Sequence, residues 1–185
     1  MRPTASLSGP TTSGPVTHAS ADFCIYYDNS AAWGLADFWK ERPVPLLNGS
    51  FEAVGKDCPE GWQTISPDAQ HRLSVDTDAY AGARCIKAEA DAGAQPSWFN
   101  YSQSGLPVRP GERITLRVMV RAQNVKGQAG WYVHAGHEKR SDVLNRVFSA
   151  GNGTFGWKKL EMKVTIPPDC TKMTVGSVLR GTGTA

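Results

Sequence analysis

The chain has 185 residues, 20 lysines and arginines against 17 aspartates and glutamates, and a formal net charge of +3. This length suits one domain plus an extension. The basic residues are scattered, without the basic stripe that is typical of nucleic-acid-binding proteins. The sequence has no run of 18 apolar residues, so no transmembrane helix is predicted. The 19 glycines and 12 prolines punctuate strand-like runs, which favours an all-β protein.

Residues 1–20 are rich in Ser, Thr, Pro, Gly and Ala and cannot bury enough apolar surface to order themselves. We therefore expect a flexible linker there. It lacks the apolar stretch of a secretory signal, and its composition favours a true N-terminus further upstream. Residues 21–44 are predicted to be a strand, over 22–28, and a connector. That strand is either the last strand of a preceding β-sandwich or an additional strand that packs on the main domain, and the sequence leaves both interpretations open.

From Pro45 onward, strand-like runs alternate with turn signals. Within 113–121, every second residue is apolar, which predicts one buried face and one wet face. Many short strands without a long amphipathic helix predict a two-sheet jelly-roll β-sandwich. The strands are expected over 46–53, 71–78, 84–90, 97–103, 112–123, 130–137, 143–149, 157–167 and 172–180.

Three features that look chemical are interpreted as structural. Gly151–Gly156 spells G-x-G-x-x-G but precedes a strand rather than a helix, so it is expected to form a hairpin turn and not a phosphate site. His134 and His137 precede Glu138, but residues 134 and 137 of a strand point to opposite faces, which argues against zinc. No motif supports paired catalytic carboxylates or a nucleophile elbow, so no catalytic residue is predicted.

The four cysteines show neither C-x-x-C nor zinc-like spacing. Cys85 falls in a strand pattern and is interpreted as an inert core thiol. Cys58 and Cys170 lie beside prolines in expected loops. The sequence leaves open whether these two form a disulfide, which an exported protein would permit.

An ordered set of short motifs runs through residues 45–185. Its members are Pro45–Glu52 (Pro-Leu-Leu-Asn-Gly-Ser-Phe-Glu), Gly61-Trp62, Ala79–Ile86, Val108–Ile114, Gly156–Leu160 and Leu179–Ala185. In this order the set resembles the carbohydrate-binding modules of families four, nine and twenty-two, β-sandwiches appended to bacterial xylanases and cellulases. Ile114 stands where the family often has Tyr. The sequence also stops before the family's Trp-Phe-Asp-Asp strand, so the resemblance implies a sandwich that lacks its last strand.

Exposed aromatic rings are typical of sugar sites, because they offer flat apolar area to the C–H faces of sugar rings. The resemblance implies that Trp98, about 14 residues after the turn at Arg84, is a tryptophan of the binding cleft. It also implies that Trp62 and Trp157 are structural. The sequence pattern adds Tyr132 and His134, which share one strand face. A hairpin at Lys126-Gly127 is expected to place them beside Arg117 and Arg121, which can hydrogen-bond sugar hydroxyls. For Tyr101, core packing and sugar binding both remain open.

The resemblance further implies a structural calcium ion. The matching positions are Ser50 (carbonyl), Glu52 (carboxylate), and Ala81 and Arg84 around the small-residue turn. Calcium takes six to eight oxygen ligands, and turn carbonyls supply them without added charge. An aspartate of the family's last strand has no counterpart here, so the site is expected to be incomplete unless the strand 22–28 brings Asp28 to within about 6 Å of Glu52.

These features predict a secreted or cell-surface module that binds a polysaccharide of the xylan or β-glucan type without cleaving it. Such a module would hold an attached catalytic domain on its substrate and so raise the effective concentration. The alternative is a structural or protein-interaction sandwich without a sugar site. Exposure of Trp98 and Tyr132 on one surface distinguishes the two.

Overall fold

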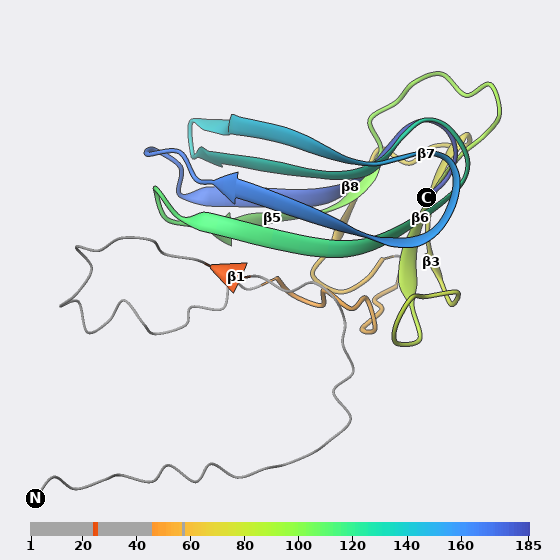
Figure 1. Cartoon of the computed structure of the whole chain (residues 1–185), viewed down its shortest axis with the longest axis horizontal. Coiled ribbons are helices and arrows are strands. Elements are labelled where there is room, and N and C mark those ends of the chain that lie inside the picture. The colour runs from red at the N-terminus through yellow and green to blue at the C-terminus, as the bar shows by residue number, and fades with distance from the viewer. Residues whose placement is uncertain (1–23, 26–45, 57) are drawn as a thin grey trace, which may run out of the picture.

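The structure, a computed structural model, describes residues 24–25, 46–56 and 58–185. Over these residues it consists of strands and turns without a helix (Figure 1), so no helix there is suited to crossing a membrane. The prediction of an all-β sandwich is confirmed. The strands are β1 (Cys24–Ile25), β2 (Gln63–Ile65), β3 (His71–Asp76), β4 (Cys85–Ala90), β5 (Asn100–Pro107), β6 (Arg113–His137), β7 (Arg140–Thr165) and β8 (Lys172–Thr184).

β6 and β7 are long, curved strands of 25 and 26 residues that pair along their whole lengths (Figure 1). The sequence predicted four shorter strands here, with hairpins at Lys126-Gly127 and Gly151–Gly156, and both hairpin predictions are wrong. Shifts in register show that the ladder absorbs these glycines as bulges instead of reversing the chain. At Gly127 and Gly181 the β6 and β8 backbones approach so closely that a Cβ on either would overlap the opposite strand.

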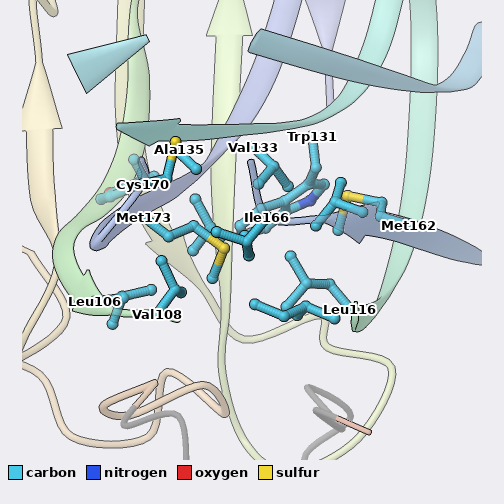
Figure 2. Close-up of a cluster of buried hydrophobic side chains, with 14 of the residues drawn as sticks. Leu106, Val108, Leu116, Trp131, Val133, Ala135, Met162, Ile166, Cys170 and Met173 are labelled. Atoms are coloured by element: carbon cyan, nitrogen blue, oxygen red, sulfur yellow. The ribbon is translucent and has the colours of Figure 1, made fainter. Parts of the chain in front are cut away.

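The core lies on the inner faces of the sheets, as the alternation predicted. Ile114, Leu116 and Val120 of β6 are buried, and Val133 and Ala135 further along β6 are fully enclosed. Figure 2 shows these later residues converging with side chains from the other strands. Trp62 lies in this cluster, as predicted. Trp157 does not: it is half-buried, with the Arg121 guanidinium 5.0 Å from its ring centroid.

The segment 46–53 was predicted to be a strand but forms a loop that is held by side-chain hydrogen bonds. Asn48 and Phe51 have φ values of 49° and 64°, outside the strand region. The Asn48 side chain donates to the carbonyls of Ala53 and Glu60 at 2.7 and 3.0 Å, and its oxygen accepts from the Ala53 amide at 3.1 Å. The Trp62 indole donates to the Asn48 carbonyl. The asparagine therefore satisfies backbone groups that a strand would have paired with a neighbour.

The linker 1–20 and most of the connector 21–44 lie outside the described residues, and so does Asp28. The described part of 22–28, β1, pairs with Ile114 and Thr115 of β6 and not with the segment of Phe51 and Glu52. The thiols of Cys58, Cys85 and Cys170 are free, so the disulfide left open by the sequence is not formed. Cys85 is half-buried, and burial raises the pKa of its thiol, which fits a weakly reactive cysteine.

Candidate functional site

The strands β5, β8, the second half of β6 and the first half of β7 lie side by side and present one outer face. Successive strand residues point to opposite faces. Because Trp131, Val133 and Ala135 belong to the core, Tyr132 and His134 point to the opposite face, as the alternation predicted, although Tyr132 is buried there and not exposed. The ladder sets Tyr132 beside Val147 and Gly176, and His134 beside Asn145 and Thr174.

A row of rings lies on this outer face. Trp98, in the loop before β5, is 40% exposed, and its ring centroid lies 5.2 Å from that of Tyr132. The Tyr132 ring in turn lies 4.6 Å from that of His134. The Arg180 guanidinium carbon of β8 lies 5.7 Å from the Trp98 ring centroid, at the outer limit of a cation–π contact. We call these four residues, Trp98, Tyr132, His134 and Arg180, the Trp98 face.

Tyr132 forms the floor of the Trp98 face. Its side chain is 4% exposed, and its hydroxyl donates to the Asn100 side-chain oxygen at 3.3 Å. A Cβ at position 176 would overlap the Tyr132 ring and come within 2.6 Å of the Tyr101 carbonyl oxygen. Glycine at 176 therefore lets the ring lie against the β8 backbone. Burial raises the pKa of Tyr132, so the hydroxyl stays neutral.

His134 and Arg180 supply the polar groups of the Trp98 face. Burial lowers the pKa of His134 below its ordinary value, although the Asn145 side chain opposes the shift. A neutral imidazole both donates and accepts hydrogen bonds, as sugar hydroxyls require. Arg180 is exposed, and no ion pair joins it to the carboxylates of the described residues. The face thus combines an exposed ring with donors of both neutral and charged kinds.

Three residues predicted for the sugar site lie elsewhere. Tyr101 faces the core with no exposed surface, and burial raises its pKa to about 12. Arg117 pairs with Glu161 at 2.9 Å, and Arg121 pairs with Asp78. These arginines lie on the first half of β6, and without a hairpin at Lys126-Gly127 the chain does not fold back to bring them near Tyr132. Arg180 was missed. Arg180 directly follows the apolar Leu179 in a strand pattern, and this alternation indicates that Arg180 faces outward. Its closeness to Trp98, however, depends on tertiary packing.

The four residues predicted for calcium lie together in the structure. Ser50, Ala81 and Arg84 line one cavity, and Glu52 Oε1 accepts hydrogen bonds from the amides of Ala83 and Arg84 at 3.0 and 3.2 Å. Among the described residues, no group of three or more His, Cys, Asp or Glu side chains is placed to hold a metal. Glu52 is the one carboxylate among these four residues, and its Oε1 already accepts from two amides, so a calcium ion here would depend on carbonyls of the surrounding turns.

The fold defined by these strands is an all-β, two-sheet sandwich. The structure is similar to the Clostridium thermocellum endo-1,4-beta-D-xylanase 10B chain with its CBM22-1 and GH10 modules, with 12% identity and a TM-score of 0.51 over 67% of this chain and 24% of that one. It is also similar to the enzymatically active domain of tailspike protein 4 of bacteriophage CBA120, with 12% identity and a TM-score of 0.50 over 68% of this chain and 18% of that one.

The C-terminal family 22 carbohydrate-binding module of the same xylanase gives 14% identity and a TM-score of 0.45, over 72% of this chain and 83% of that one. No protein-family model and no curated protein matches the sequence. This chain spans only a quarter or less of the xylanase and tailspike chains. At these identities, the likeness to those two chains establishes the fold.

Proposed function

We propose that this domain binds a polysaccharide through the Trp98 face without cleaving it. The observation that carries the proposal is the exposed ring of Trp98, held against Tyr132 and beside Arg180 on the outer face of a sheet. A fixed aromatic ring stacks on a sugar ring at little cost in conformational entropy. The neighbouring imidazole and guanidinium then select among hydroxyl arrangements.

We further propose that the ligand is a xylan or a β-glucan, and that the domain holds an attached polysaccharide-active enzyme on its substrate outside the cell. The similar xylanase chain was solved with xylohexaose, which supports a xylose polymer as the first candidate. Binding of this kind raises the effective concentration of substrate at a tethered catalytic domain without new chemistry.

Affinity electrophoresis tests this function. We expect migration of the full chain to be retarded in gels that contain xylan or mixed-linkage β-glucan and to be unchanged in gels without polysaccharide. Incubation with the same polymers is expected to release no reducing ends. Absence of retardation in both gels would leave the spacer as the better interpretation, and release of reducing ends would contradict a non-catalytic role.

Calcium binding at Glu52 is proposed as a separate, structural property. The Glu52 carboxylate would hold the ion with the carbonyls of Ser50, Ala81 and Arg84, and the bound ion would tie the loop 46–56 to the turn after Tyr80. Stabilisation by a ligand present at 100 times its dissociation constant amounts to about 2.7 kcal/mol. We therefore expect calcium to raise the melting temperature by several degrees, as measured by calorimetry against a chelator.

Glu52→Gln is expected to abolish this rise, because it removes the only charged ligand. Glu60→Gln is the matched control, since Glu60 is an exposed glutamate of the same loop region, and it should respond to calcium as the unchanged chain does. A melting temperature indifferent to calcium, or an equal response of the Glu52→Gln variant, would contradict the calcium site.

A further inference from the structure

The loop that carries Trp98 is joined to the turn before β3 by a buried histidine, His71. His71 is the first residue of β3 and is 3% exposed. Its Nδ1 lies 2.9 Å from both carboxylate oxygens of Asp68, and its Nε2 lies 3.0 Å from the backbone carbonyl oxygen of Gln95. Gln95 precedes Trp98 by three positions. One side chain therefore links the turn before β3 to the loop 91–99.

Both groups that face the His71 ring can only accept hydrogen bonds. The Asp68 carboxyl is ionised, since the Gln70 amide and then the His71 side chain lower its pKa, and a backbone carbonyl has no proton to donate. A neutral imidazole has one N–H and satisfies only one of these acceptors, whereas the imidazolium donates to both. The cation would also be paired with a carboxylate, as a buried charge requires.

A ring contact gives His71 a second hold on the same loop. The Phe99 ring is buried, and its centroid lies 4.8 Å from that of the His71 ring. Phe99 directly follows Trp98 and belongs to the smaller hydrophobic cluster, which includes Leu179 of β8. His71 thus contacts the chain on both sides of Trp98, at Gln95 and at Phe99.

The other contacts to this loop hold only its beginning. The Asp91 amide donates to the Gln70 carbonyl at 3.0 Å, and the Asp91 carboxylate pairs with Arg72 at 2.7 Å. Within the described part of the chain, the bond from His71 to Gln95 is the one hydrogen bond that reaches residues 95–98 from outside the loop. The segment next to Trp98 therefore depends on His71.

We propose that His71 is a positioning residue for sugar binding, which fixes the loop 91–99 and so holds the Trp98 ring in place on the Trp98 face. This role rests on the proposed function of that face. Because His71 is buried, it acts through Gln95 and Phe99 and not by contact with the sugar. A loop that spends less time in its binding position weakens the apparent affinity by the same factor.

Two substitutions separate the two hydrogen bonds of His71. A glutamine amide extends about as far as Nε2, so His71→Gln can still donate to the Gln95 carbonyl. An asparagine amide extends only about as far as Nδ1, so His71→Asn keeps a donor for Asp68 and loses Gln95. By calorimetric titration with the polysaccharide that retards the full chain, we expect His71→Asn to weaken binding at least about tenfold and His71→Gln about threefold or less.

Arg72→Gln is the matched control for His71→Asn. It removes the ion pair of Arg72 with Asp91 at the start of the same loop, and this pair is half exposed. Exposed ion pairs contribute little, so the affinity should stay close to that of the unchanged chain. If Arg72→Gln and His71→Asn weakened binding equally, the loop as a whole, and not the bond to Gln95, would control Trp98.

A merely structural role of His71 is distinguished by coupling to Trp98. In the Trp98→Ala background, His71→Asn should have no further effect on affinity, because the ring that it positions is gone. General destabilisation would lower the affinity equally in both backgrounds. Asp68→Asn is a milder second variant, since Asp68 is exposed and only the charge beside Nδ1 is lost. It should weaken binding less than His71→Asn does.

The pH dependence of affinity gives a further readout. Histidine changes its charge between about pH 5 and 8, so rising pH removes one of the two His71 N–H groups and should weaken binding. The facing carboxylates stay ionised, because Gln70 and His71 lower the pKa of Asp68, and Arg72 lowers that of Asp91. His134 also titrates but is present in both chains, so the difference between the unchanged chain and His71→Gln isolates His71.

Deuterium exchange tests the positioning without any polysaccharide. His71→Asn should speed exchange of the amides in the loop 91–99 at least about tenfold and leave those of β7 unchanged. Unchanged exchange in the loop, or unchanged affinity of His71→Asn, would overturn the role of His71 and leave the sugar site standing. If the unchanged chain bound no polysaccharide, the proposed function would fail, and loop exchange would still decide whether His71 fixes the loop.

Discussion

Replacing Trp98 by alanine is expected to weaken polysaccharide binding at least about thirtyfold. Truncation of an anchoring aromatic at a binding site typically costs about 2 kcal/mol or more, which corresponds to that factor in the dissociation constant. The ring is 40% exposed and rests on Tyr132, so its loss removes the stacking surface and leaves the fold beneath it intact. Isothermal titration calorimetry with an oligosaccharide of the retarding polymer measures the change.

Tyr80→Ala is the matched control for Trp98→Ala. Tyr80 is 55% exposed and lies against Trp157, away from the Trp98 face. Its removal should leave the affinity unchanged, whereas Arg180→Ala should lower affinity by less than Trp98→Ala does. Equal affinities of the Trp98→Ala and Tyr80→Ala variants would place the sugar site elsewhere on the molecule.

Gly176→Ala is expected to reduce both the stability of the domain and its affinity for polysaccharide. The new methyl group would overlap the Tyr132 ring and lie 2.6 Å from the Tyr101 carbonyl oxygen, which is backbone and cannot turn away. Overpacking of this kind typically costs about 1–3 kcal/mol. Because the Tyr132 ring supports Trp98, its displacement should also weaken binding. Thermal unfolding and calorimetric titration of one variant measure both effects.

Gly156→Ala provides the comparison for Gly176→Ala. Gly156 also lies in a long strand, but a Cβ there meets no atom within 4 Å. This substitution should leave melting temperature and affinity close to those of the unchanged chain. If the two alanine variants behaved alike, the close contact between Tyr132 and the β8 backbone would not be what fixes the Trp98 face.

The fold class followed from the sequence because apolar alternation reports directly which strand face is buried. The same alternation placed Tyr132 and His134 together on one outer face, since residues two apart on a strand always share a face. The lengths of β6 and β7 could not be predicted. Glycine-rich segments such as 151–153 occur both in hairpins and in bulges, and only the partner strands decide between them.

The position of Tyr101 could not be predicted either, because a strand pattern does not say which of two opposite faces is covered when both carry polar and apolar residues. Arg180 lies 82 positions from Trp98 in the sequence. Their closeness depends on the packing of the loop before β5 against the end of β8. The predicted role for Arg117 and Arg121 failed for the same reason, since it depended on a chain reversal that does not occur.

The pairing of β6 with β7 from end to end, interrupted only by bulges, has a consequence for how the domain opens. A ladder that runs from residue 113 to residue 165 crosses the whole molecule, so neither half can separate from its neighbours without strain on the other. Local opening in native proteins proceeds in cooperative units. Here one unit should include most of the ladder, and its amide protons should exchange with deuterium together, at the rate of global unfolding.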